Sequence, residues 1–150
     1  MDKSVNNNDI FKSIKESMGL KEINIVDYSP LTLAYIRDGI YEIVIRTMIV
    51  DEANRQVNKI HKAAADLVKA KTQSDMILSL YEDLTEDEAR VYKRGRNAKA
   101  ITRAKNASMG DYRRATGFEA VMGYLYLTEQ SERMMELIKK GLNNIKEDKE

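Results

Sequence analysis

The sequence predicts an all-α fold, a single helical bundle formed by the 150 residues of the chain. Only one proline and seven glycines interrupt it, while strong helix formers such as Ala, Leu, Lys and Glu are abundant. Apolar residues recur mostly at helical spacing, not in the alternation typical of strands. A chain of this length can bury a sizeable core as one domain.

The N-terminal third should contain little regular structure before one long helix. Residues 1–28 are expected to form a loose tail or a short helix. Ser29 and Pro30 make a good helix start, with Ser as the N-cap and Pro in the first turn. The helix should run to about Val50, and the polar residues 51–54 should end it.

The middle of the chain should contain three further helices. Residues 57–81 alternate apolar and basic positions at helical spacing and are expected to form two helices that join near residues 71–74. Thr85 and Glu88 have the spacing of a capping box, which predicts a helix that starts there and runs to about Gly95.

The C-terminal third should contain a basic loop and two helices. The helical pattern weakens over residues 96–110 and returns over residues 112–127 and 131–142. The charged residues 143–150 should fray. We therefore expect the main domain to comprise residues 29–142.

The charges are unevenly distributed along a nearly neutral chain. Residues 90–114 hold nine Lys or Arg and one acid, a net +8, whereas the remainder holds 16 basic and 23 acidic residues, a net −7. A concentrated basic segment is typical of proteins that contact phosphate backbones.

Some classes of protein are excluded. The chain has no cysteine and one histidine, so it has no disulfide framework, thiolate metal site or histidine metal cluster. Its polar N-terminus lacks the apolar stretch of a signal peptide. Asp38, Glu42 and Arg46 interrupt the longest apolar helix, so it should not span a membrane. These features suit a cytoplasmic protein.

Asp38 and Glu119 each interrupt a strongly apolar helix, SPLTLAYIRDGIYEIVIR and YRRATGFEAVMGYLYL respectively. A carboxylate in such surroundings is costly to desolvate unless it is paired or binds a cation. The two residues therefore suggest a hard divalent metal held between two core helices. The alternative is that each is a core carboxylate paired with Arg or Lys. Gly117 and Gly123 flank Glu119 and would let the two acidic helices approach closely.

These motifs carry a family resemblance. LTLAYIRDGIYE and TGFEAVMGYLYL, with RGRNAKAITRAKNA between them, resemble Mini-ribonuclease III, the short branch of the ribonuclease III family without a separate double-stranded-RNA-binding domain. The likeness runs in order from about Ser29 to about Leu137. It implies a ribonuclease III-type endonuclease domain within the all-α class.

The resemblance also implies an activity. Asp38 matches the Asp of the family's Gly-Asp-Ala signature and Glu119 the Glu of its Phe-Glu-Ala signature, so both are expected to be catalytic and to bind Mg²⁺, with Mn²⁺ as a substitute. One or two carboxylates suffice for Mg²⁺, which keeps several waters. The implied protein is a homodimer that cuts double-stranded or structured RNA, leaves 5′-phosphates and matures precursor large-subunit (23S) ribosomal RNA.

The chain departs from its larger relatives near the site. Ala34 and Thr116 stand where those enzymes carry further acids, and Arg37 stands where the family usually has glycine. Arg37 could pair with Asp38, compete with the metal or point outward to RNA. Consecutive side chains lie about 100° apart on a helix, which favours the outward orientation. Glu42 lies one turn after Asp38 and either binds metal through water or, as we favour, pairs with Arg46.

The basic segment resembles the family's RNA-contacting stretch. Its guanidinium, ammonium and amide groups suit phosphate and 2′-hydroxyl contacts across an RNA minor groove. Few aromatic residues are interleaved with them, which favours duplex over single-stranded RNA. The alternative is a solvated charged loop. The expected RNA-binding residues are Arg94, Arg96, Asn97, Lys99, Lys105 and Arg113.

Two other functions remain open on the sequence alone. The chain could be a catalytically weak or inactive RNA-binding or ribosome-assembly protein of the same fold, with Arg37 as the reason. It could also be a helical scaffold whose acids are merely paired. Cleavage of an RNA duplex with Mg²⁺ and with EDTA separates the three.

Overall fold

The computed structural model describes residues 10–21, 24, 28–52, 57–98 and 108–148. The described residues form seven α-helices and one 3₁₀ turn and contain no strand, which confirms the predicted all-α class. The elements are α1 (Ile10–Ser17), α2 (Pro30–Glu52), α3 (Val57–Val68), α4 (Ala70–Leu80), η3 (Tyr81–Asp83), α5 (Glu86–Asn97), α6 (Met109–Leu127) and α7 (Ser131–Asp148).

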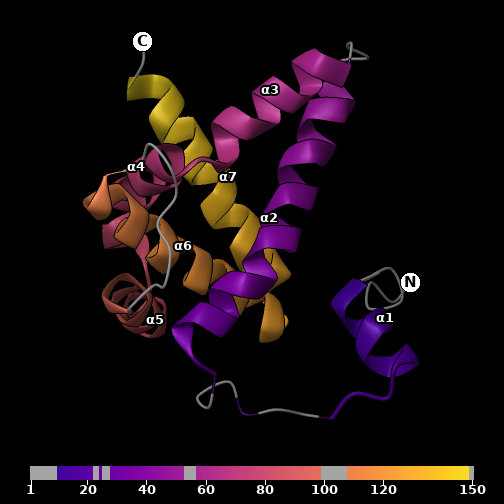
Figure 1. Ribbon diagram of the computed structural model, residues 1–150. Helices are drawn as coiled ribbons and strands as arrows, with labels where there is room; N and C mark the ends of the chain where they lie inside the picture. The colour runs from indigo at the N-terminus through magenta and orange to yellow at the C-terminus, as the bar shows by residue number, and fades with distance from the viewer. Residues whose placement is uncertain (1–9, 22–23, 25–27, 53–56, 99–107, 149–150) are drawn as a thin grey trace.

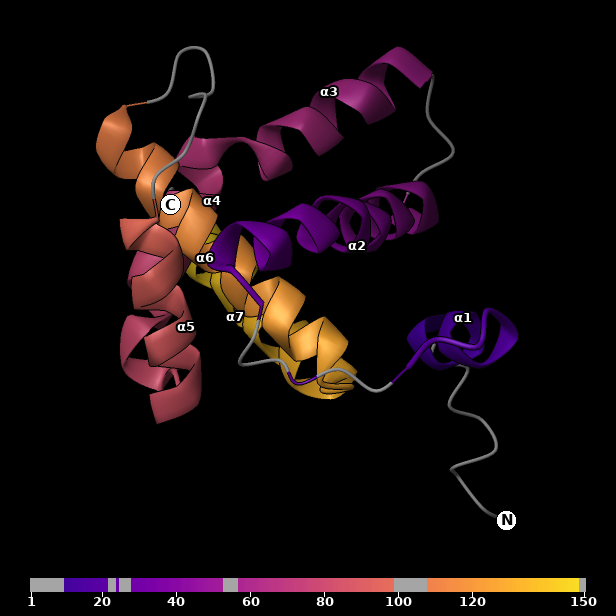
Figure 2. The same cartoon turned by 60° about the horizontal axis from the view of Figure 1, so that its bottom comes forward.

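Helix α6 is the centre of the bundle. It packs against α2, α4, α5 and α7, and α1 stands to one side (Figure 1). Turning the molecule shows α5 lying across α6 and α3 lying along α2 (Figure 2). Buried residues cover most sides of α6, because neighbouring helices surround it. This is why its sequence is apolar nearly all round.

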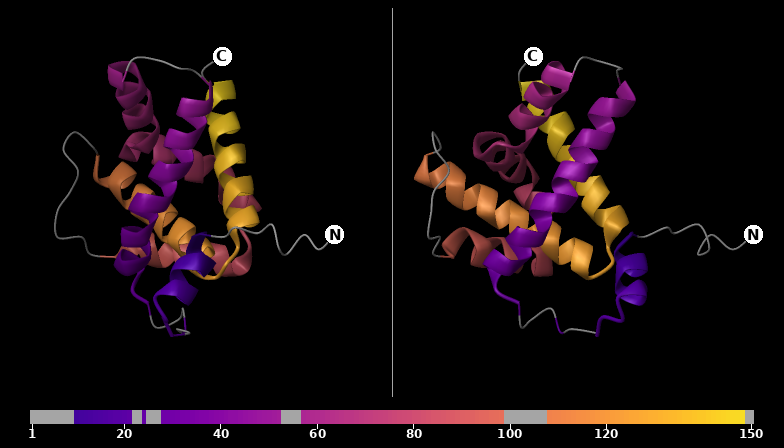
Figure 3. Two further views of the ribbon diagram at one scale, coloured as in Figure 1. Left: turned by 90° about the vertical axis from the view of Figure 1, so that its right-hand side faces the viewer. Right: turned by 45° about the vertical axis from the view of Figure 1, so that its right-hand side comes forward.

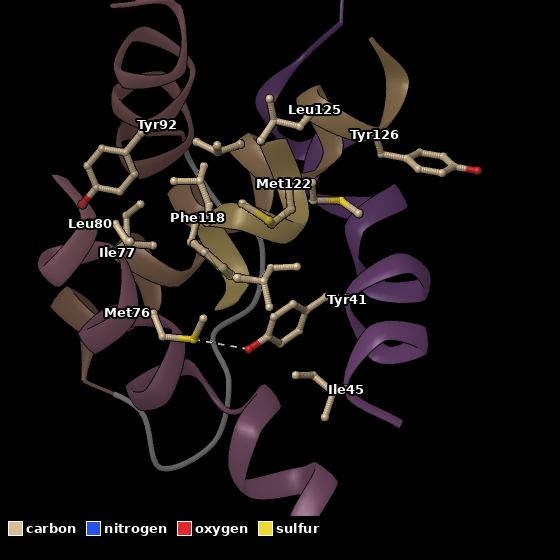
Figure 4. Packing of buried hydrophobic residues seen from close by; sticks show 14 of the residues in the cluster. Tyr41, Ile45, Met76, Ile77, Leu80, Tyr92, Phe118, Met122, Leu125 and Tyr126 are labelled. Carbon is tan, nitrogen blue, oxygen red and sulfur yellow. Dashed lines mark hydrogen bonds between the residues drawn. The ribbon is translucent and has the colours of Figure 1, made fainter. Parts of the chain in front are cut away.

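Tyr41 of α2 connects the long helices to α4. Its ring is fully buried and meets the ring of Phe118 edge-on, with centroids 5.7 Å apart. Its hydroxyl donates to the carbonyl oxygen of Leu67 at 3.0 Å and contacts the sulfur of Met76 at 3.4 Å (Figure 4). Burial raises the pKa of Tyr41, so the phenol remains a donor, although the nearby Arg37 guanidinium opposes that rise.

Two glycines of α6 allow close helix crossings. A Cβ on Gly123 would collide with the carbonyl oxygen of Leu33, so α2 and α6 cross there with backbones nearly in contact. A Cβ on Gly117 would lie 2.6 Å from Cδ1 of Tyr92. Gly123 therefore allows the predicted close approach of α2 and α6. The prediction for Gly117 was wrong, because that glycine allows α5, not α2, to approach α6 closely.

Two helix starts were predicted from their capping residues. The hydroxyl oxygen of Ser29 accepts from the amide of Thr32 at 3.1 Å, which confirms it as the cap of α2. The capping box of Thr85 and Glu88 is also present. The helix junction lies at Lys69, earlier than expected.

Both ends of the predicted loop over residues 96–110 are helical, and residues 99–107 lie outside the described residues. Helix α5 continues to Asn97, and α6 begins at Met109, because the hydroxyl oxygen of Ser108 caps it by accepting from the Asp111 amide at 3.0 Å. Helix α7 runs beyond its predicted end to Asp148.

Glu88 links the start of α5 to α7. Its buried carboxylate accepts from the Arg133 guanidinium at 2.9 Å on each oxygen and from the Thr85 amide at 2.9 Å. Burial alone would raise the pKa of Glu88, but these hydrogen bonds outweigh burial and hold the pKa below its usual range.

Acid should therefore remove the stabilisation that Glu88 contributes. A depressed carboxyl pKa stabilises the fold fully above the unfolded-state value of about 4.3 and progressively less as the pH falls through the folded-state value. We expect the free energy of unfolding of wild type to exceed that of Glu88→Gln at pH 7, and the gap to narrow below about pH 4. Urea unfolding of both proteins between pH 7 and pH values below about 4 measures this difference in the free energy of unfolding. A gap that does not change with pH would contradict the assigned pKa shift.

Among the residues that the structure describes, no helix has the length and apolar character needed to cross a bilayer.

Candidate active site

The candidate site lies one helical turn from the crossing of α2 and α6. Gly123 faces Leu33 at the crossing. Glu119 is four residues before Gly123, and Arg37 is four residues after Leu33. Residues four apart share a helix face, so these two side chains project into the same space between the helices.

Arg37 and Glu119 form an ion pair there, between Nη2 of the guanidinium and Oε1 of the carboxylate. Only 6% of the Arg37 side chain and 19% of the Glu119 side chain are exposed. The expected outward orientation of Arg37 was therefore wrong. Arg37 belongs to a series of buried residues spaced by four along α2, namely Leu33, Arg37, Tyr41, Ile45 and Ile49.

The other residues expected near the site have different positions. The backbone of Asp38 is in α2, but its side chain lies outside the described residues. Glu42 accepts from Arg46 at 3.4 Å, which is the predicted pairing. Thr116 is buried, and its hydroxyl donates to the carbonyl oxygen of Tyr112 at 3.0 Å. Neither Thr116 nor the buried Ala34 offers a carboxylate.

The chemistry of the described donors suits a hard cation. Glu119 is a largely buried carboxylate whose charge is balanced by a cation already in contact with one oxygen. Carboxylate oxygens are the ligands that Mg²⁺ prefers. Among the described side chains, which do not include that of Asp38, there is no group of three or more His, Cys, Asp or Glu suited to a metal.

The basic residues divide into two groups. Arg94 and Arg113 are exposed, and within the described part of the chain neither makes an ion pair. Arg96 lies 5.6 Å from the Tyr92 ring centroid and donates to the exposed side chain of Asn97 at 3.4 Å. Lys99 and Lys105 lie outside the described residues.

The second group forms ion pairs with acids of its own helices. Arg90 pairs with Asp87 at 2.9 Å within α5. Arg114 donates to the hydroxyl of Ser74 at 2.7 Å and pairs with Asp111 at 3.2 Å, so it ties α6 to α4. Net charge along the sequence could not separate the paired residues from the unpaired ones, because pairing depends on an acid one turn away and, for Arg114, also on a hydroxyl of another helix.

The chain was compared with known proteins. The Ribonuclease III domain family matches residues 31–130. A Mini-ribonuclease 3 of Clostridium tetani is 50% identical over 125 residues, which cover 83% of this chain and 80% of that one. A Mini-ribonuclease 3 of Enterococcus faecalis is 51% identical over 110 residues, covering 72% and 83% respectively.

A solved structure has the same fold. The crystal structure of a protein from Fusobacterium nucleatum superposes with a TM-score of 0.73 and 29% sequence identity, over 82% of this chain and 98% of that one. Together with the two signature motifs on α2 and α6, these relatives establish that the chain belongs to the Mini-ribonuclease III branch of the ribonuclease III family and is an endoribonuclease that acts on RNA.

Proposed function

We propose that the chain hydrolyses phosphodiester bonds in double-stranded or structured RNA, with Asp38 and Glu119 as ligands of Mg²⁺ or of Mn²⁺ in its place. Members of the family depend on divalent metal ions. The observation that carries the proposal is the Glu119 carboxylate, held beside a cation at the crossing of the two signature helices. A divalent ion that binds this carboxylate must either displace the guanidinium from Oε1 or bind beside it.

A bound divalent ion would activate water and stabilise the charge that develops on the phosphate. The protein's own contribution is positional. The crossing at Gly123 holds Glu119 against α2, where only 19% of its side chain is exposed. The low dielectric there strengthens every charge interaction at the site.

The exposed basic side chains of α5 and α6 support a duplex-binding surface. We propose that Arg94, Arg96, Asn97, Lys99, Lys105 and Arg113 contact the RNA backbone. Arg94 and Arg113 are exposed and form no ion pair with an acid of the described residues. Phosphate contacts of this kind position an RNA duplex without reading its sequence.

Replacing Arg94 and Arg113 with Ala should weaken RNA binding and flatten its salt dependence. Each lost phosphate contact lowers the slope of log K against log salt by somewhat less than about one unit. Titration of a labelled RNA duplex at several salt concentrations measures the slope. Lys139 and Lys146, exposed on α7, supply the control: their replacement with Ala removes the same charge and should leave the slope unchanged. Equal slopes in wild type and in both variants would show that RNA binds to another face of the protein.

A second copy of the chain is the proposed partner. The surface of α2 opposite its buried face carries the exposed apolar residues Leu31, Tyr35, Ile43 and Val50, with Tyr35 78% and Val50 61% exposed. This helix lies in front of α6 in side view (Figure 3). Its apolar density predicted a helix covered on most sides, whereas α6, α3 and α5 leave this face exposed in the single chain. A homodimer through this face would cover the rest.

Charge placed on this face should prevent dimerisation. Tyr35→Glu and Ile43→Glu bury no charge in the single chain, because both positions are exposed. We expect sedimentation to give a dimer for wild type and a monomer for the double variant, with helical content unchanged. Lys62→Glu, at an exposed position on α3, is the control. A double variant that still dimerises would exclude this face.

The proposed substrate is precursor large-subunit ribosomal RNA in the cytoplasm, cut to leave 5′-phosphates. A second candidate function is that of a weak or inactive RNA-binding protein, and the Arg37–Glu119 pair is the observation that favours it. Labelled duplex and single-stranded RNA incubated with Mg²⁺ or with EDTA separate the two. Duplex cleavage that EDTA abolishes supports the enzyme, and binding without cleavage supports the alternative.

A further inference from the structure

The partner of Glu119 is built into the core. The Arg37 guanidinium lies 5.7 Å from the centroid of the Tyr41 ring, and that ring is fully buried. The Arg37 side chain lies between Leu33 and Tyr41 on the face of α2 that packs on α6. The Arg37–Glu119 ion pair is therefore held in a buried position between α2 and α6, unlike the exposed pair of Arg46 and Glu42.

Such a pair resists the loss of either partner. A buried carboxylate without a cation, or a buried guanidinium without an anion, is strongly unfavourable. Arginine also stays charged at every accessible pH. A divalent ion that approaches Glu119 must therefore displace the guanidinium from the oxygen or bind beside a like charge, and both reduce its affinity.

We propose that Arg37 is a tethered counter-ion that competes with the divalent metal for the Glu119 carboxylate and so sets the metal concentration at which the site fills. This inference rests on the proposed function, because it takes Glu119 as a metal ligand. It makes Arg37 a positioning residue of the Glu119 carboxylate. It also means that Arg37, in place of the family's usual glycine, lowers the affinity of the site for the metal.

The test is direct Mn²⁺ binding without RNA, followed by electron paramagnetic resonance of the free ion. Arg37→Gly restores the family's usual residue, and Arg37→Met removes the charge while keeping side-chain volume and helix propensity. We expect both to bind Mn²⁺ at least about tenfold more tightly than wild type, within the usual range of coupling between two ligands. Arg46→Met removes one positive charge from the exposed side of the same helix and should bind as wild type does.

Thermal unfolding gives an independent readout. Mn²⁺ should raise the midpoint of both Arg37 variants more than that of wild type at the same ion concentration, because tighter binding to the folded state stabilises it more. Adding Glu119→Gln to either variant should remove the gain.

The outcomes distinguish the two proposals. Tighter binding in both Arg37 variants that Glu119→Gln abolishes supports the competition. Equal affinities in wild type and the Arg37 variants, still dependent on Glu119, overturn the competition and leave the proposed site standing. If the Mn²⁺ affinity does not depend on Glu119 in any of the proteins, both the competition and the proposed metal site are wrong.

Discussion

Glu119→Gln and Asp38→Asn should each lower the rate of RNA cleavage by at least about a thousandfold, which corresponds to about 4 kcal/mol of transition-state stabilisation. Each amide keeps the shape of the carboxylate and removes the charge that would hold a divalent ion, whose catalytic contribution is several kcal/mol. Binding of an RNA duplex should change little, since neither residue is among the proposed RNA contacts. Single-turnover cleavage and equilibrium binding of the same duplex measure the two effects.

Glu42→Gln is the matched control. It removes a carboxylate from the same helix as Asp38, and its partner is Arg46 at the surface. Cleavage should stay within a few-fold of wild type. Circular dichroism melting of all three variants separates lost chemistry from lost folding. Near wild-type cleavage by either Glu119→Gln or Asp38→Asn would show that the site is misassigned, and a large loss in Glu42→Gln would give that residue the metal role that its pairing argues against.

Gly123→Ala should lower the free energy of unfolding by about 3 kcal/mol or more, at the upper end of overpacking costs. The added Cβ would collide with the Leu33 carbonyl oxygen, and the obstructing atom belongs to backbone that cannot rotate away. Relief requires α2 to move from α6, which would also separate the helices that carry Arg37 and Glu119. Urea unfolding measures the stability, and the cleavage rate of the folded fraction measures the displacement.

Gly110→Ala in the same helix is the control for that substitution. Its Cβ would come within 3.3 Å of the guanidinium end of Arg114, a group that can shift. The stability should stay within about 1 kcal/mol of wild type, since Ala is also the better helix former. Equal effects of the two substitutions would mean that the tight crossing at Gly123 does not govern the packing of α2 on α6.

Local signals in the sequence predicted most of the secondary structure. Ser29 and the pair Thr85 and Glu88 cap their helices as expected, because a cap depends only on residues three apart. Helix ends were less predictable. The continuation of α7 to Asp148 is supported by Ile145, which packs against the core and extends its apolar face into the charged end.

The candidate site was predictable in part. The apolar surroundings of Glu119 indicated a charge that needs a partner, and the pattern could not say which one. The spacing of Leu33, Arg37 and Tyr41 already contained the signal that Arg37 faces inward. The angle between neighbouring residues was the wrong measure, because the buried face of α2 is defined by residues four apart. Gly117 was misassigned since its neighbour, Tyr92, is distant in sequence.

The structural role of Arg114 was hidden for the same reason. Its hydrogen-bond partner Ser74 is on α4, and a run of basic residues gives no sign of it. Arg94 and Arg113, by contrast, remain exposed. For Arg114, the packing of α6 against a helix distant in sequence shows that its guanidinium is used within the fold.

The most direct test of the account is the position of Mn²⁺ in crystals of the wild-type protein soaked in that ion, found by anomalous scattering. If Glu119 is a metal ligand, we expect an anomalous peak within about 2.3 Å of one of its carboxylate oxygens, in the space between α2 and α6. The Arg37 guanidinium should have moved away from Oε1. Crystals of Glu119→Gln should lose the peak. An intact Arg37–Glu119 pair at saturating Mn²⁺, with the ion bound elsewhere or not at all, would contradict the account.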